Sequence, residues 1–283
     1  MAGSGYECRK YACWWFLAQR NFSPLARPQL LWYEFGKDGV GKSKECYNFP
    51  KFTESYKTVK RMFFQQEFLD FFIELAPNNH KDWFDLNRKR YEQFVKEPFK
   101  DFVSHLIAKM AEKDPAFKEL EAKDCIFRIN RDIRFSKDKQ PYKLQVSAII
   151  TPEGKKSKAV NGVYFELGPE KIRVYGGVYE IDKEDLLIAR EGIAAHPEKF
   201  KKAYRDPLFI ETFGEIRGEK NKILPKELKE ASEMEPLIYN KQWYFFTEFE
   251  PEMILSDQLD QLILNCYEAG RPVEQFFNEL IKR

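Results

Sequence analysis

The hydrophobic period of the chain changes from helical to alternating near its middle, and this change limits the possible folds more than any other feature. Four apolar residues that follow Met62 share one helical stripe: Phe64, Phe68, Phe71 and Leu75. Alternating apolar runs then occupy four segments: 125–136, 142–150, 163–167 and 172–178. A tight turn at 168–170 joins the last two, and short connections with alternation are typical of antiparallel strands. The sequence therefore predicts an α+β fold, an antiparallel sheet with helices packed on one face.

Helix-start signals place further elements around this sheet. Asn79 with Asp82 resembles a capping box that opens a second helix, and Pro98 fits the first turn of a third. Asp182 and His196 start two more helices after the sheet. The remaining predicted elements are a late strand and two C-terminal helices: Gln242 to Phe249, Pro251 to Cys266 and Pro272 to Ile281.

Size and composition favour a globular chain. With 283 residues, of which 43% are hydrophobic and 33% charged, the chain can bury a substantial core. No stretch approaches the ~18 apolar residues of a membrane span, and the five Cys lack paired spacing, so we expect a cytoplasmic protein with reduced thiols and no membrane partner. Residues 62–283 hold 36 Lys and Arg against 40 Asp and Glu, a net charge of −4. Because duplex nucleic acid is bound through a basic face, we expect none to be bound here.

Residues 1–61 differ from the rest of the chain. They carry 11 Lys and Arg against 5 Asp and Glu and show no sustained hydrophobic period, so we interpret them as an N-terminal extension of a single domain at 62–283. The alternatives are a poorly ordered segment or a start-site artefact in which Met62 is the initiator. Gly36 to Ser43 matches the P-loop pattern GxxxxGK[ST]. Pro50 interrupts the helix that should follow, so a flexible Gly/Lys turn is the favoured interpretation.

The most specific motif is RINRDIRFSKDKQPYK, from Arg128 to Lys143. As a strand it would place Arg128, Asn130, Asp132 and Arg134 on one face, with successive members about 7 Å apart, so that two guanidinium groups lie on either side of a carboxylate. Arg131 would interrupt the opposite apolar face and would need a partner such as Asp138. The candidate anion contacts are Arg128, Arg131, Arg134 and Lys139. The candidate orienting or acid–base residues are Asp132, Asp138 and Tyr142.

Several functions are compatible with this motif. The leading prediction is that the motif binds a small phosphorylated or carboxylated ligand. The alternatives are a phosphoryl-transfer or hydrolytic enzyme that uses Asp132 or Asp138, a structural lattice of Arg and Asp, and a module for single-stranded nucleic acid. The three His and five Cys show no metal-ligand spacing, so we predict no metal site. Catalytic residues, cofactors and oligomeric state are left open by the residues alone.

The same motif resembles the RxxRDxRFxxDKxPY signature of the domain-of-unknown-function 2461 family, a mainly bacterial group. Two further segments are similar to the family pattern: NNHKDWFDLNRKRYEQFVKEPF at 78–99 and YGGVYEIDKEDLLIAREGI at 175–193. The resemblance covers about residues 62–283 and leaves 1–61, with the P-loop pattern, outside it. It implies a fold and the position of a functional motif, and it names no substrate.

Overall fold

A computed structural model describes residues 32–35, 41–44, 61–156 and 162–281, and the chain divides into two units, Met1–Thr58 and Val59–Arg283. In the first unit, β1 (Trp32–Phe35) pairs antiparallel with β2 (Gly41–Lys44). The Lys and Ser of the P-loop pattern therefore lie in a strand, whereas a P-loop has the start of a helix there. The Gly/Lys turn predicted at 36–40 lies outside the described residues, as does most of the N-terminal extension.

The second unit is built on a four-stranded antiparallel sheet in the order β3-β4-β5-β6. Its strands are β3 (Val146–Ile150), β4 (Val163–Leu167), β5 (Ile172–Val178) and β6 (Trp243–Phe249). The predicted α+β class is confirmed, as are the strands at 163–167 and 172–178 and the late strand. Each strand pairs with its neighbour in sequence order, so every connection links adjacent strands.

The helices of this unit precede the sheet in the chain, lie between β5 and β6, and follow β6. The helices before the sheet are α1 (Gln66–Leu75), α2 (Lys81–Leu86), α3 (Arg88–Tyr91), the π-helical turn η1 (Glu92–Lys96), α4 (Glu97–Ala111), η2 (Pro115–Phe117) and α5 (Ala122–Cys125). A short 3₁₀ turn, η3 (Gly154–Lys156), follows β3. Between β5 and β6 lie α6 (Lys183–Ala195), α7 (Pro197–Tyr204), α8 (Pro207–Phe213), η4 (Lys226–Leu228), α9 (Lys229–Met234) and η5 (Pro236–Tyr239). After β6 come η6 (Pro251–Leu255) and α10 (Leu259–Leu280).

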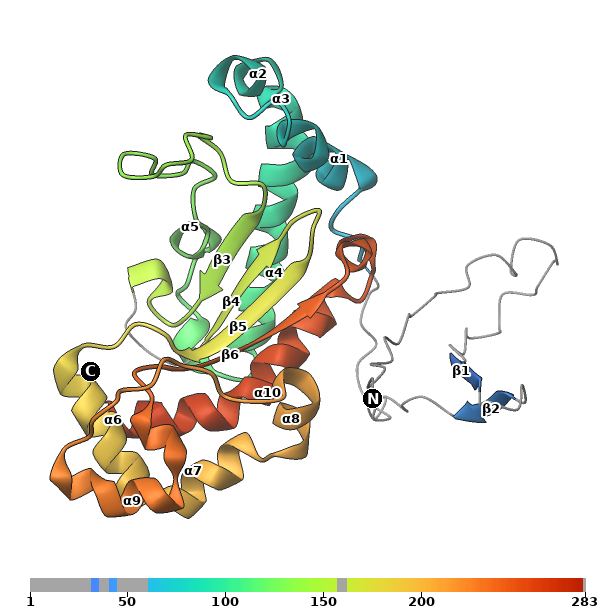
Figure 1. Ribbon diagram of the computed structural model, residues 1–283. Helices are drawn as coiled ribbons and strands as arrows, with labels where there is room; N and C mark the ends of the chain where they lie inside the picture. Colours follow the sequence, from blue (N-terminus) through green and yellow to red (C-terminus); the bar gives the residue numbers. More distant parts are fainter. Residues whose placement is uncertain (1–31, 36–40, 45–60, 157–161, 282–283) are drawn as a thin grey trace, which may run out of the picture. The chain divides into compact units, whose positions relative to one another are not determined.

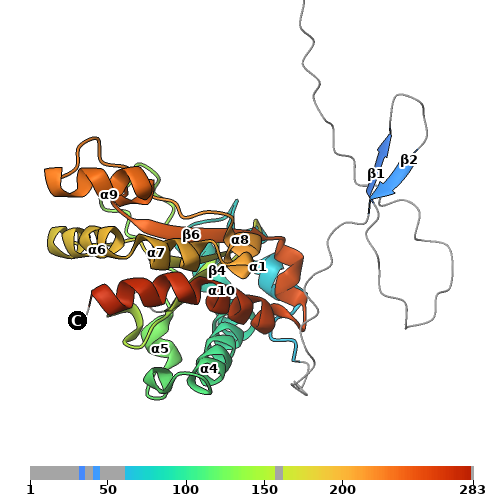
Figure 2. The ribbon, with the colours of Figure 1, turned by 90° about the horizontal axis from the view of Figure 1, so that it is seen from below.

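The hydrophobic core lies between one face of the sheet and the helices α4 and α10, which Figures 1 and 2 show on the same side of the strands. Phe165 of β4 meets the ring of Phe102 of α4 edge to face, at a centroid distance of 5.9 Å. On β6, Trp243 packs against Phe277 of α10 at 5.2 Å. All four side chains are buried, so the predicted packing of helices on one sheet face is confirmed.

Three of the predicted helix starts agree with the structure and one does not. Pro98 lies in the first turn of α4, and the Asp182 side chain accepts a hydrogen bond from the Asp185 N–H at the start of α6. His196 precedes Pro197 at the start of α7. The capping box at Asn79 was wrong: the N-cap of α2 is His80, and Asn79 makes other contacts.

The strand predicted at 125–136 does not form. α5 ends at Cys125, and only two isolated bridges, Ile126 with Ala148 and Asn130 with Tyr142, lie near the segment. The reason is local: Asp132 accepts from the backbone N–H of Arg134 at 3.3 Å, and Asp138 accepts from that of Gln140 at 3.0 Å. Both are Asx turns, which bend the chain and override the alternating pattern.

The two predicted C-terminal helices are one. α10 runs through Pro272, although a proline inside a helix costs ~3 kcal/mol relative to alanine. Val273, Phe276 and Phe277, just after the proline, are all buried, and this packing outweighs the local cost. Among the described residues, no helix combines the length and the apolar character that crossing a membrane would need.

Candidate functional site

The Arg128–Lys143 motif forms a closed loop between α5 and β3, seen in Figure 1 as the long unlabelled segment between them. Two backbone hydrogen bonds close its neck: the Arg131 N–H donates to Pro141 O at 2.8 Å, and the Lys143 N–H donates to Ile129 O at 2.9 Å. Because proline has no N–H, this pairing cannot extend into a ladder through Pro141. The charged residues of the motif are thus presented on a loop and not on the two faces of a strand.

Helix α2 anchors this loop through Tyr142. The Asn79 side chain donates to Tyr142 O at 2.9 Å and accepts from the Tyr142 N–H at 3.1 Å. The Tyr142 ring is buried and stacks on Phe84 at a centroid distance of 4.1 Å, and burial raises the pKa of its hydroxyl. The segments 78–99 and 128–143, which carry the resemblance to the family, therefore meet in space, and Tyr142 holds them together.

Two of the three candidate arginines are paired within the loop. Arg131 Nη1 donates to Asp138 Oδ2 at 2.5 Å and to Gln140 O at 3.2 Å. Arg134 binds Asp132 with both ends of its fork, Nε to Oδ1 at 3.0 Å and Nη2 to Oδ2 at 2.6 Å. The Arg134 fork lowers the pKa of Asp132, and the Gln140 N–H together with Arg131 lowers that of Asp138. Both carboxylates are therefore ionised, and each already binds an arginine of the loop.

The remaining cations of the loop are differently placed. Lys139 Nζ donates to Ile133 O at 3.0 Å and so ties the loop to itself. Arg128 is exposed, and neither Arg128 nor Lys143 forms an ion pair with any residue in the described part of the chain. Partial burial lowers the pKa of Lys143, and the nearby positive charge of Arg128 lowers it further, while Glu166 acts in the opposite direction. Two cations at the neck of the loop thus lack an ion-pair partner among the described residues, although the charge of Glu166 acts on Lys143.

An apolar side chain stands at the tip of this loop. Phe135 is 96% exposed, the highest value among the large hydrophobic side chains in the described ranges. The Arg134 guanidinium lies over its ring, 5.9 Å from the centroid. Phe135 was expected on the apolar face of a strand, and the Asx turn at Asp132 instead carries it into solvent.

The sheet face opposite the helices carries a row of aromatic side chains that begins beside the loop. Centroid distances of 5.9, 5.6 and 5.2 Å separate successive rings along the row, which runs Phe127, Tyr164, Tyr175 and Phe246. Lys143 lies over the first ring at 5.5 Å, and Arg217 lies over the last at 4.2 Å. Tyr164, Tyr175 and Phe246 are cross-strand partners in register. The row therefore runs across three strands from the loop to the far edge of the sheet.

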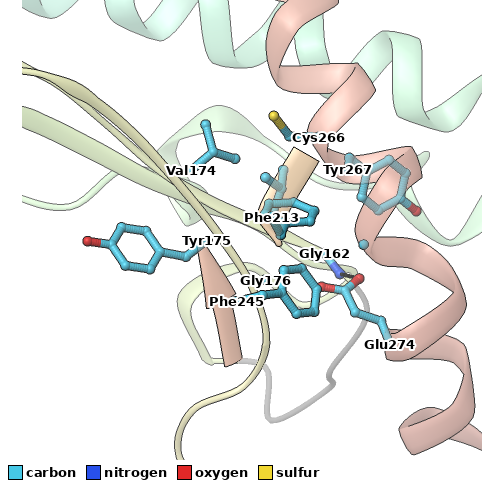
Figure 3. A pocket seen from close by; sticks show the side chains of 11 residues that line it. Gly162, Val174, Tyr175, Gly176, Phe213, Phe245, Cys266, Tyr267 and Glu274 are labelled. Carbon is cyan, nitrogen blue, oxygen red and sulfur yellow. Dashed lines mark hydrogen bonds between the residues drawn. The ribbon is translucent and has the colours of Figure 1, made fainter. Parts of the chain in front are cut away.

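On the helical side of the sheet lies a buried carboxyl group that our reading of the sequence missed. Glu274 of α10 accepts hydrogen bonds from the N–H groups of Gly162 at 3.0 Å and Gly177 at 3.1 Å. Figure 3 shows Glu274 among Phe245, Phe213 and Tyr267, while Tyr175 points away to the other side. Burial raises the pKa of Glu274 to about 8, against the lowering effect of the two N–H donors. The surrounding space does not admit a water molecule, so we interpret Glu274 as a structural residue that joins α10 to the sheet.

A second buried charge, Arg190 of α6, was missed as well. It donates to Asn240 O at 2.8 Å and to Tyr239 O at 3.4 Å, at the end of η5. Carbonyl groups at the end of a helix carry partial negative charge, which offsets part of the cost of burying a cation. Desolvation lowers the pKa of Arg190. Within the described ranges, no three His, Cys, Asp or Glu side chains gather where they could hold a metal ion.

The comparisons with known proteins give a family and no activity. The chain has no match among the curated proteins that were searched. The family model described as "conserved hypothetical protein (DUF2461)" matches residues 67–276, a range that contains the loop, the four-stranded sheet and most of α10. The chain belongs to this family.

Proposed function

We propose that the protein binds a small phosphorylated or carboxylated ligand at the Arg128–Lys143 loop, with Arg128 and Lys143 as the first contacts. The observation that carries this proposal is the position of these two cations. Both lie at the neck of the loop, where the Lys143 N–H bonds to Ile129 O, and neither forms an ion pair with a described residue. Burial lowers the pKa of Lys143 and Arg128 lowers it further, although Glu166 raises it by a larger effect than that of Arg128. An anion between them would remove this repulsion and would accept charge-assisted hydrogen bonds from both.

The other charged residues of the motif hold the loop in its conformation. The pairs of Arg131 with Asp138 and Arg134 with Asp132 fix the course of the loop, and Lys139 holds its turn. In this proposal Arg134 is also an anion contact, because its side chain is 77% exposed and the far side of its fork can face a ligand. Arg131, whose side chain is 28% exposed, contributes mainly to the frame.

The catalytic alternative has weaker support. A general base acts best when its pKa lies near the operating pH, and the pKa values of Asp132 and Asp138 are both lowered. Each carboxylate also has hydrogen bonds to an Arg side chain and to a backbone N–H. These contacts favour an orienting role for the two carboxylates over proton transfer.

Isothermal titration of the full chain with inorganic phosphate and with citrate tests the proposal. Arg128→Gln and Lys143→Gln each remove one charge from the predicted site, and each should weaken binding by roughly tenfold or more, since a hydrogen bond to a charged group contributes about 1.5–3 kcal/mol. Lys123→Gln is the control, because it removes the same charge from a residue outside the loop that pairs with Glu121. Equal affinities for the wild type and both loop variants, or no binding of either anion, would refute the proposal.

A further inference from the structure

The structure points to single-stranded nucleic acid as the ligand of this loop, with a base stacked on Phe135 and phosphates held by the cations of the loop. This inference rests on the proposed function, because it identifies the phosphorylated ligand as one nucleotide unit of a strand. The inference differs from the proposed function because it requires an aromatic contact, which a simple phosphate or carboxylate would not make.

The first argument is the exposure of the Phe135 ring. A fully exposed aromatic side chain gains nothing for the fold, and stacking of a base covers such a ring whatever the base sequence. The aromatic row on the sheet offers less ring surface, because its four members are only partly exposed. Its rings pack against each other, and Lys143 and Arg217 lie over the two ends. Among the ring and cation contacts of the described residues, Phe135 has that with Arg134 at 5.9 Å alone, so most of its ring is free.

The second argument is the distribution of charge around that ring. The loop holds six Lys and Arg against two Asp, a net charge of +4 within 16 residues. Three of the cations precede Phe135 and three follow it: Arg128, Arg131 and Arg134, then Lys137, Lys139 and Lys143. Because the pairing of Lys143 with Ile129 closes the loop, the first and last cations, Arg128 and Lys143, lie at its neck, whereas Arg134 lies over the Phe135 ring. A strand whose base stacks on the ring would bring further phosphates toward the neck, which a single nucleotide does not carry.

The third argument restricts the ligand to a single strand. Outside the loop, residues 62–283 hold 30 Lys and Arg against 38 Asp and Glu, a net charge of −8, which repels a long stiff polyanion. In a duplex the base faces are covered by neighbouring bases, so a ring could stack only after the duplex is unstacked. A flexible single strand can touch the loop alone and has free base faces.

Fluorescence anisotropy with a labelled 12-nucleotide oligothymidylate and the full chain tests the inference. Phe135→Ala should raise the Kd about 5- to 100-fold, and Phe135→Tyr, which keeps a ring, should change it less than twofold. Ile223→Ala is the matched control, since Ile223 is 80% exposed and lies outside the loop. Unchanged melting temperatures would show that the variants are folded. Phe135→Ala should leave the dependence of Kd on salt unchanged, whereas Arg128→Gln should reduce it.

Competing ligands separate the possible outcomes. An abasic 12-mer with the same phosphates should compete at least fivefold more weakly than the oligothymidylate, and a 12-base-pair duplex or thymidine monophosphate more weakly still. Equal competition by the abasic strand, the duplex or the mononucleotide would overturn the inference, as would equal binding by the wild type and Phe135→Ala. If Arg128→Gln then weakens both the abasic and the normal strand, the proposed anion site stands without the base contact. If Arg128→Gln has no effect on any phosphate ligand, both proposals fail.

Discussion

Replacing Glu274 by Gln should remove a pH dependence of stability from the fold. The Glu274 carboxyl is buried, joins α10 to the start of β4 and to Gly177 of β5, and has its pKa raised from 4.5 to about 8. Arg271 and the two N–H donors favour the ionised form, but desolvation outweighs them. In the unfolded chain the same carboxyl should titrate near its ordinary pKa.

The sign and size of the effect follow from these two pKa values. Between pH 4.5 and pH 8 the folded protein keeps a proton on Glu274 that the unfolded chain has lost, so stability falls as the pH rises. The slope is about 1.4 kcal/mol per pH unit, which gives a loss of about 3 kcal/mol between pH 6 and pH 9. The contribution of Glu274 is fully present below the unfolded pKa and is lost once the pH passes the folded one. Such a loss is a large share of the ~5–15 kcal/mol of a typical domain.

The Gln side chain is neutral at every pH, but its amide nitrogen cannot accept from a glycine N–H. At pH 6, Glu274→Gln should therefore be less stable than the wild type by about 1–3 kcal/mol, the cost of one unsatisfied buried donor. At pH 9 the two proteins should be nearly equal, or the variant should be the more stable. Urea unfolding followed by tryptophan fluorescence measures the free energy of unfolding of the two proteins at pH 6, 7, 8 and 9. The difference between the two proteins cancels all other titrating groups, so a difference that is constant over this range would refute the reasoning.

Two further comparisons test the frame of the loop and the sheet. Arg131→Ala removes the contacts to Asp138 and Gln140 and should lower the free energy of unfolding by about 1 kcal/mol, whereas Arg134→Ala, which removes a far more exposed arginine, should leave it nearly unchanged. The reverse order in urea unfolding would contradict the assigned roles. Gly177 has φ +87°, and a Cβ there would lie 2.3 Å from Trp243 O, so Gly177→Ala should cost about 3 kcal/mol or more. Gly214→Ala, with φ +76° and open space around the position, has the backbone strain without the clash and should cost less than Gly177→Ala. Equal losses in thermal unfolding would show that the backbone clash has been overestimated.

The sheet could be predicted from the sequence because its strands are local features with one strong period. β4, β5 and β6 alternate between buried and less buried residues, and a connection of four residues joins the first two. The cap at Asp182 is local in the same way, since the side chain bonds to the N–H three residues later. The predictions of these three strands and of this cap were confirmed.

The position of the candidate loop could be predicted from the sequence, but its backbone conformation could not. The alternating pattern at 125–136 favoured a strand, and the sequence gives no direct measure of how strongly an Asp side chain competes for the backbone. The Asx turns at Asp132 and Asp138, followed by Pro141, were the signals for a loop. Tertiary contacts were harder still: Asn79 resembles a capping residue in its own segment, yet it binds the backbone of Tyr142, 63 residues away. The roles of the site residues stay predictions that the binding experiments decide.

The buried carboxyl group of Glu274 was overlooked because a helix end was predicted at Pro272. α10 carries buried residues at the helical period: Ile263, Tyr267, Gly270, Glu274 and Phe277. A single acidic residue on such a stripe indicates a paired or protonated carboxyl group, because an unpaired buried charge is too costly to keep. Dividing the helix at Pro272 broke the stripe and left Glu274 in the first turn of a short helix, where an acidic residue is ordinary. The free energy of packing on both sides of Pro272 exceeds the local cost of the proline. A long apolar stripe should therefore be followed through a proline before a helix end is placed there, and any charge found on the stripe should be treated as a specific contact.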